Sequence, residues 1–276
     1  MLDYPLIRRR FNQAALSDHR YFEVHDQIGR RLLGRLSYIH LQPKRVLHLG
    51  LRPGGLKPVL QKQYRKAQHV YCDFSAGMLA QQRPNWWQRD TRVCAEYDHL
   101  PFVNGAFDLV IAHLAVHWIK EPQQMIQECM RVLSPGGLFL FTTVGPDTFH
   151  ELKSAGFSVH NFIDMHHWGD WLQQTGFEHP VVDMEYLTLR YSSFSTLLKE
   201  RKASGTQAAK TSGGLVGSAA WQRRIAAYPR DTSGAWPLTI ELVYGHAWRS
   251  EHAKRDHSDE VLVPVTAIRR PSDSAQ

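Results

Sequence analysis

Five apolar segments alternate with helix-like segments between residues 45 and 145. These segments are the predicted strands 45–50, 69–73, 91–96, 106–116 and 137–145, and a clean amphipathic helix is expected over 122–134. The segment 106–116 is nearly all apolar, as a strand buried on both faces should be. Strands that alternate with helices specify a parallel sheet covered by helices on both faces. We therefore predict an α/β fold whose ligand lies beyond the carboxyl ends of its strands.

Helical segments are expected on both sides of this core. Residues 1–42 are a predicted helical lead-in, because apolar side chains recur at steps of three and four residues until Pro43. Residues 192–236 mix helix formers with glycine and serine. That composition indicates a helical insertion or lid.

Two later segments, 179–191 and 238–248, are predicted strands, and we expect them to pair with each other. The pattern favours one domain over residues 1–250, followed by a C-terminal tail over 251–276.

The bulk composition is that of an ordinary globular protein, with 43% hydrophobic and 21% charged residues. No signal peptide or 18-residue apolar run is present, so we expect a cytoplasmic protein without a membrane segment. The three cysteines have no CxxC spacing and are expected to be reduced thiols. His166 and His167 point apart on a helix, so no metal is predicted.

The net charge of +7 and the pI near 9.4 allow an acidic partner. The basic residues are scattered, so a solvated surface explains them as well as a docking patch does. Because no recognition motif or basic-aromatic stripe is present, we expect no nucleic-acid binding.

The first strand runs directly into a glycine-rich turn, with the sequence RVLHLGLRPGG over 45–55. Turns without side chains let backbone N–H groups approach a bound nucleotide. An acid is usual at the position of His48, and Arg52 interrupts the glycines. The turn therefore suggests a nucleotide pocket that departs from the usual pattern.

Acidic residues end the next two predicted strands, Asp73 in the second and Glu96 in the third. A carboxylate in the position of Asp73 can accept hydrogen bonds from both ribose hydroxyls of a nucleotide. The alternative is an acid that interacts favourably with the N-terminus of the following helix.

The order of elements and the local motifs resemble the class I S-adenosylmethionine-dependent methyltransferases. The motifs are YCDFSAGML around Asp73, the spacing from Glu96 to LPF, FDLVIAHLAVHW at 107–118 and RVLSPGGLFLFTT at 131–143. The resemblance implies a doubly wound, seven-stranded Rossmann-like sheet, mostly parallel with an antiparallel terminal strand. It also implies S-adenosylmethionine as cofactor, held by His48, Gly50, Leu51, Gly54, Asp73, Phe74, Glu96, Tyr97 and His113.

Three further segments, within 144–156, 164–191 and 237–248, resemble one branch of this fold. That branch comprises the biotin-pathway malonyl-acyl-carrier-protein O-methyltransferases and a related mitochondrial complex I assembly factor, an arginine hydroxylase. The resemblance implies methylation of the free carboxylate of a malonyl group on an acidic acyl carrier protein. We expect the protein to be a monomer. The candidate catalytic residues are His113, His117 and Arg201. Ordinary packing of the histidines and solvation of Arg201 are the alternatives.

Aligned with the family, His48 replaces the acid of the first motif and Arg52 its second glycine. A protonated histidine would repel the cationic amino group of the cofactor, and the arginine must either point away or fill the pocket. Two interpretations follow: a working or weakened methyltransferase, and a non-catalytic or repurposed relative that acts through a partner. A third, narrower interpretation is an enzyme that hydroxylates a protein arginine.

Overall fold

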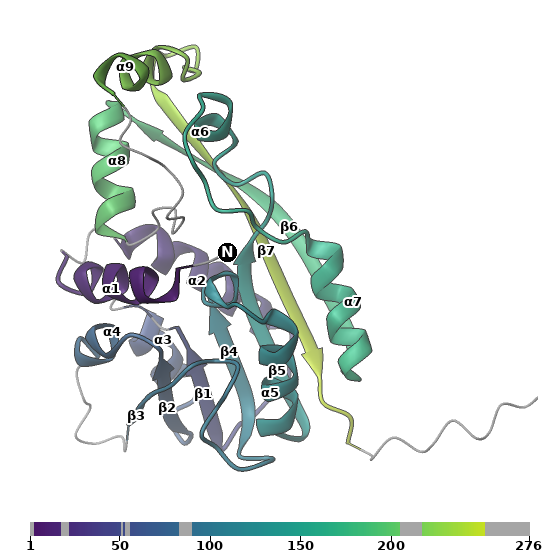
Figure 1. Ribbon diagram of the computed structural model, residues 1–276. Coiled ribbons are helices and arrows are strands. Elements are labelled where there is room, and N and C mark those ends of the chain that lie inside the picture. The colour runs from purple at the N-terminus through teal and green to yellow at the C-terminus, as the bar shows by residue number, and fades with distance from the viewer. Residues whose placement is uncertain are drawn as a thin grey trace, which may run out of the picture.

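The computed structural model describes residues 3–17, 22–50, 52, 56–82, 90–204 and 217–251. Figure 1 shows a central sheet with helices on both faces. The strands are β1 (Arg45–Leu49), β2 (Gln68–Asp73), β3 (Thr91–Cys94), β4 (Phe107–His113), β5 (Leu133–Val144), β6 (Glu178–Tyr191) and β7 (Trp236–Trp248). The helices are α1 (Tyr4–Ala14), α2 (Glu23–Leu36), α3 (Leu56–Gln63), α4 (Ala76–Ala80), α5 (Pro122–Val132), α6 (His150–Ser154), α7 (Met165–Thr175), α8 (Phe194–Ala203) and α9 (Ser218–Ala226), with a short 3₁₀ helix η2 (Val116–Trp118) after β4.

The sheet has seven strands in the order β3-β2-β1-β4-β5-β7-β6. Neighbouring strands from β3 to β5 pair in parallel, and β7 pairs antiparallel with both β5 and β6. The predicted pairing of the two late strands is confirmed, with Tyr191 opposite Trp236. The predicted fold class is therefore confirmed, including its antiparallel last strand.

Two apolar layers cover the sheet. Residues of α1, α4, α5 and α7 fill one layer, and residues of α2, α3, α6 and α8 fill most of the other. Strand β1 feeds both, because successive side chains of a strand point to opposite faces. Leu47 and Leu49 belong to the first layer and Val46 to the second.

The boundaries of several predicted elements are wrong by a few residues, including the strand predicted over 106–116, which is Phe107–His113. Helix α5 begins at Pro122, as predicted, but ends at Val132, and β5 already begins at Leu133. Leu133 pairs with Phe107 of β4, and this partner decides its conformation. The third strand ends at Cys94, so Glu96 lies in the connection that follows it.

The lead-in and the insertion are helical, as predicted. The lead-in supplies α1 and α2, and the segment 192–236 supplies α8 and α9. Within that segment, 205–216 lies outside the described residues, as does the predicted tail beyond residue 251. In the part of the chain that the structure describes, no helix is long and apolar enough to cross a membrane.

Candidate cofactor and acceptor site

Helix α1 covers the carboxyl ends of the first strands, where the ligand of a doubly wound sheet is expected (Figure 1). Its Asn12 fastens it to the start of α4, because Asn12 Oδ1 accepts from the Ser75 hydroxyl at 2.7 Å and from the Gly77 N–H at 3.0 Å. Ser75 is the N-cap of α4, with its Oγ accepting from the Met78 N–H. The two helices and the strand ends therefore enclose one site.

Asp73 lies at the centre of this site. Its side chain is buried, and its Oδ1 accepts from the backbone N–H of Ser75 at 2.7 Å. Burial raises the pKa of this carboxyl to about 6, although the Ser75 N–H and the Arg52 guanidinium both lower it. Asp73 is thus ionised at neutral pH at a cost in solvation, and a ligand that donates hydrogen bonds would offset that cost.

Gly50 and Tyr97 complete the surroundings expected for a nucleotide. Gly50 has a φ of +72°, and a Cβ there would lie 2.5 Å from Ala115 Cβ and 3.3 Å from the Tyr97 hydroxyl. The Tyr97 ring is buried beside Phe74 at 5.5 Å between centroids, and its pKa is raised by burial and by Asp73. A glycine with room for close backbone approach, a carboxylate and a phenol beside an aromatic ring fit the ribose and adenine of S-adenosylmethionine.

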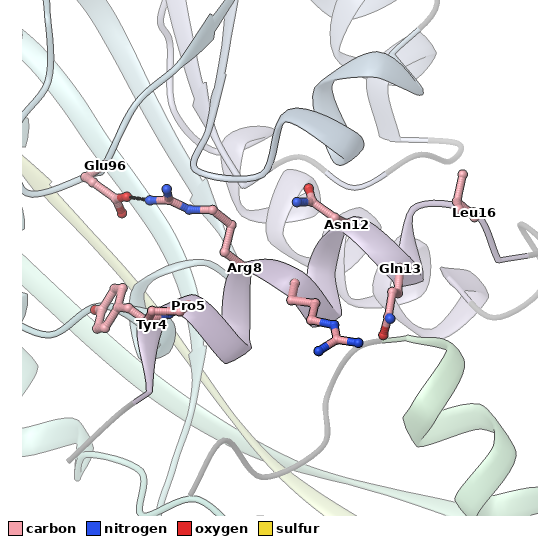
Figure 2. Close-up of a pocket in the computed structure, with 8 residues that line it drawn as sticks. Tyr4, Pro5, Arg8, Asn12, Gln13, Leu16 and Glu96 are labelled. Atoms are coloured by element: carbon pink, nitrogen blue, oxygen red, sulfur yellow. Dashed lines mark hydrogen bonds and ion pairs between the residues drawn. The ribbon is translucent and has the colours of Figure 1, made fainter. Parts of the chain in front are cut away.

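Glu96, the other predicted acid, binds α1 instead of facing inward. It forms an ion pair with Arg8, and both side chains are partly exposed. Figure 2 shows this pair at one end of a groove along α1 that also includes Asn12 and Gln13. The groove has a volume of about 680 Å3 and is lined mostly by residues of α1. Contact between Glu96 and the cofactor remains a prediction.

Arg52 enters the site. Of the two orientations left open by the sequence, pointing away or filling the pocket, the side chain adopts the second. Its side chain is 4% exposed, and its guanidinium carbon lies 4.1 Å from the centroid of the Phe11 ring. Nη1 donates to the carbonyl of Ser204, just after α8, at 3.1 Å. Burial lowers the pKa of Arg52 to about 10, opposed by Asp73 and Tyr97, so the side chain is a cation at neutral pH.

His48 is neutral and faces β2 and α3. Its Nε2 lies 2.9 Å from His69 Nδ1, and the His69 Nε2 lies 3.2 Å from the Tyr64 carbonyl. A carbonyl only accepts, so His69 donates to it and His48 Nε2 must be the donor to His69. Burial lowers the pKa of both imidazoles. His48 therefore does not carry the charge that would repel a cationic cofactor, and its contact with the cofactor remains a prediction.

Leu51 and Gly54, the other two predicted cofactor residues of the turn, lie outside the described residues. Their roles remain predictions.

His113 ties three elements together at the end of β4. Its Nδ1 lies 2.9 Å from the Thr142 hydroxyl of β5, and its Nε2 donates to the carbonyl of His25 in α2 at 2.9 Å. Burial lowers its pKa to about 4, which keeps it neutral. With both ring nitrogens engaged, His113 suits a positioning role better than proton transfer.

A small cavity of about 60 Å3 lies beyond the ends of β4 and β5. Its lining includes His25, His117, Trp118 and Phe149. Burial lowers the pKa of both histidines well below the usual range, and His25 Nδ1 has no hydrogen-bond partner among the described residues. The cavity therefore presents neutral imidazoles to an acceptor.

Two of the residues around this cavity are strained. Leu114 has a φ of +49° and Phe149 a φ of +60°, in the left-handed region that large side chains rarely adopt. Strain of this kind is retained when surrounding contacts enforce it, and it is concentrated at functional sites.

Arg201 brings a buried cation to the same region. Its guanidinium carbon lies 4.8 Å from the centroid of the Phe149 ring, and its side chain is buried. Burial lowers its pKa to about 10, opposed by Tyr228 and Tyr191. Arg201 is among the residues predicted from the sequence, whereas His25 is not. The signal was a polar residue in register with the buried Ile28 and Leu32 of α2.

No group of three or more metal-ligating side chains occurs among the residues that the structure describes.

The comparisons with known proteins agree with this geometry. Residues 47–141 match the family described as "Methyltransferase domain". The chain is 38% identical to the malonyl-[acyl-carrier protein] O-methyltransferase of Legionella pneumophila, over 96% of this chain and 98% of that protein. The chain belongs to the malonyl-[acyl-carrier protein] O-methyltransferase family. A second member, enzyme 1 of Coxiella burnetii, is also 38% identical, over 98% of this chain and 97% of its own length.

A member of this family is an enzyme, and its cofactor is S-adenosylmethionine. Solved structures support the fold. A Bacillus halodurans protein assigned as a methyltransferase has a TM-score of 0.59 at 16% identity, covering 80% of this chain and 98% of its own. The [4+2]-cyclase SpnF has a TM-score of 0.51 at 18% identity, covering 83% and 82%. Since a cyclase shares this fold, the fold alone does not specify the reaction.

Proposed function

We propose that this protein transfers a methyl group from S-adenosylmethionine to the free carboxylate of a malonyl group carried by an acyl carrier protein, in biotin synthesis. The observation that carries the proposal is the 38% identity to a malonyl-[acyl-carrier protein] O-methyltransferase over nearly the whole of both chains. The buried Arg201 beside the cavity adds physical support, because a carboxylate acceptor needs a cation to offset its own desolvation.

S-adenosylmethionine supplies an activated methyl group on a sulfonium centre. In this chain, Asp73 would accept hydrogen bonds from the ribose hydroxyls. Tyr97 and Phe74 would flank the adenine, and Gly50 would leave room for the backbone to approach the cofactor. We retain Glu96 and His48 as weaker candidates for the same role. The fit has one exception, because Arg52 lies among these residues and must move.

The acceptor side needs no general base, since a carboxylate is already a nucleophile at neutral pH. What remains for the protein is to hold the acceptor oxygen in line and to exclude water. We assign the first task to Arg201, His117 and His25. Phe149 and Trp118 would exclude water from the reacting oxygen. Neutral imidazoles suit this task because they can donate a hydrogen bond without neutralising the nucleophile.

The basic insertion would meet the acidic carrier. Lys199 and Lys202 of α8 and Arg223 of α9 are exposed, and α8 also carries the buried Arg201. Complementary charge mainly accelerates encounter and orients the partner. We propose that the segment 192–236 acts as a lid, in a monomeric, cytoplasmic, one-domain enzyme that binds neither membrane nor nucleic acid.

The test is incubation of the protein with S-adenosylmethionine and malonyl-acyl carrier protein, followed by mass spectrometry of the carrier. We expect the malonyl carrier to gain one methyl group and acetyl-acyl carrier protein, which lacks a free carboxylate, to gain none. Rescue of a biotin auxotroph that lacks its methyltransferase would place the activity in the pathway. Cofactor binding without methylation of the malonyl carrier would reject this acceptor and favour a repurposed relative.

Replacement of His25 tests the acceptor cavity. We expect His25→Ala to raise the KM for malonyl-acyl carrier protein about fivefold, because the variant loses about one neutral hydrogen bond of roughly 1 kcal/mol. The dissociation constant of S-adenosylhomocysteine should stay unchanged, since His25 lies on the acceptor side. His40→Ala, in the connection after α2, is the control. An unchanged KM would contradict the role.

A further inference from the structure

Arg52 contacts two separate parts of the site and interacts electrostatically with a third. Its guanidinium lies over the ring of Phe11 in α1, at 4.1 Å, and it donates to the carbonyl of Ser204 after α8, at 3.1 Å. It also attracts the carboxylate of Asp73 at the end of β2 strongly enough to affect the ionisation of both groups. One side chain from the glycine-rich turn thus joins the lead-in helix to the insertion, within the electrostatic influence of the acid that ends the second strand.

The same space is needed by the cofactor. Asp73 and Tyr97 are the groups that fit a ribose and an adenine, and both lie close enough to Arg52 to affect its pKa. The Phe11 ring beneath the Arg52 guanidinium lies 4.8 Å from the Phe74 ring, which in turn packs beside Tyr97. A cofactor held by Asp73 and Tyr97 would therefore lie against the buried Arg52 side chain.

Arg52 is held in a way that permits release. Among the described residues, its Nη1 donates to one neutral acceptor and its Nη2 has no hydrogen-bond partner. A buried guanidinium whose N–H groups are not all hydrogen-bonded pays a large solvation cost. It regains hydration when it moves out to water. The positive charge of the cofactor would further destabilise the buried position of Arg52, because like charges repel in a site with little water.

We propose that Arg52 is an internal competitor of S-adenosylmethionine: it closes the cofactor site through its contacts with Phe11 and the Ser204 carbonyl and its attraction to Asp73, and cofactor binding displaces it. Displacement breaks the contact with Ser204, which lies directly after the helix that carries Arg201. Binding of the cofactor is thereby coupled to the end of α8 and to the acceptor cavity. This inference rests on the proposed function for the identity of the cofactor.

The first test measures cofactor affinity by calorimetry, without any acceptor. We expect Arg52→Ala to bind both S-adenosylmethionine and S-adenosylhomocysteine at least tenfold more tightly than the natural protein. Arg52→Gln keeps much of the side-chain volume but removes the charge. It should improve binding of the cationic S-adenosylmethionine more than that of the neutral S-adenosylhomocysteine. Arg45→Ala, at the exposed opposite end of β1, is the control and should change neither affinity.

The second test needs no variant. Hydrogen exchange of the natural protein should become faster at residues 200–204 when S-adenosylhomocysteine saturates it, because the Ser204 carbonyl loses its donor and the end of α8 is released. Arg52→Gln should show the faster exchange without any ligand. This readout keeps the proposal testable if Arg52→Ala fails to fold.

Several results would overturn the inference. They are weaker or unchanged cofactor affinity in both Arg52 variants, the absence of cofactor binding by natural and variant proteins alike, and unchanged exchange at 200–204 on saturation. Tighter cofactor binding by the variants together with no methylation of malonyl-acyl carrier protein would leave the inference standing and reject the proposed acceptor. The failures of the two proposals are therefore distinguishable.

Discussion

Asp73→Asn is expected to melt a few degrees higher than the natural protein at pH 7.5 and to bind S-adenosylhomocysteine at least about a hundredfold more weakly. Loss of binding follows from the loss of two charge-assisted hydrogen bonds to the ribose, each worth roughly 1.5–3 kcal/mol. Calorimetry measures the affinity and differential scanning fluorimetry the melting temperature. Asp170→Asn, at an exposed position of α7, is the control and should change neither quantity.

The gain in stability follows from the pKa of Asp73. The value of about 6 in the folded protein exceeds the ordinary value of 3.8, so the folded state binds this proton more tightly than the unfolded state does. The penalty is absent below the unfolded pKa, develops as the pH rises from 3.8 to 6, and is complete above that range. It amounts to the order of 3 kcal/mol at neutral pH. Asparagine is uncharged, like the protonated acid, so the variant avoids this penalty.

The attraction between Asp73 and Arg52 does not reverse this sign, because the pKa of Asp73 is raised even with Arg52 nearby. The melting-temperature difference between Asp73→Asn and the natural protein should therefore shrink as the pH falls from 7.5 to 5. A variant that is less stable than the natural protein at pH 7.5 would show that Asp73 serves the fold more than the site.

Arg201→Gln is expected to lower kcat/KM for malonyl-acyl carrier protein by about a hundredfold to a thousandfold, as loss of a cation from a buried carboxylate costs about 3–4 kcal/mol. The pKa of about 10 keeps Arg201 charged throughout the neutral range, so the loss should not depend on pH between 6 and 8. Steady-state kinetics with varied carrier concentration measure this fall in kcat/KM.

A binding experiment separates carboxylate recognition from a structural role of Arg201. The natural protein should bind malonyl-acyl carrier protein more tightly than acetyl-acyl carrier protein, and Arg201→Gln should lose that preference while its affinity for S-adenosylhomocysteine stays the same. Lys202→Gln, the exposed neighbour, should keep the preference and lose only part of the association rate. A retained preference in Arg201→Gln would contradict the assignment.

Much of the fold could be predicted from local patterns. The buried strand β4 was recognisable as a continuous apolar run, and α5 as a three- and four-residue repeat that begins at Pro122. These signals are local, so they survive without tertiary information. The start of β5 was not predictable, because Leu133 is extended through its pairing with Phe107, a residue 26 positions earlier.

The site was predicted less completely, because burial and side-chain direction depend on distant elements. Asp73 was predictable from its place at the end of a strand. His25 was not recognised, although it is a polar residue on the buried face of α2. The orientation of Glu96 toward Arg8 depends on how α1 crosses the strand ends, which no local pattern specifies.

The sequence by itself determined the class of sheet, the family and the position of the unusual residues His48 and Arg52. Only the tertiary structure decided what those two residues do, since both depend on contacts with remote parts of the chain. His48 is kept neutral because β2 supplies His69 as its partner and burial excludes water. Arg52 fills the site because Phe11 and Ser204, far apart in the sequence, meet around its guanidinium.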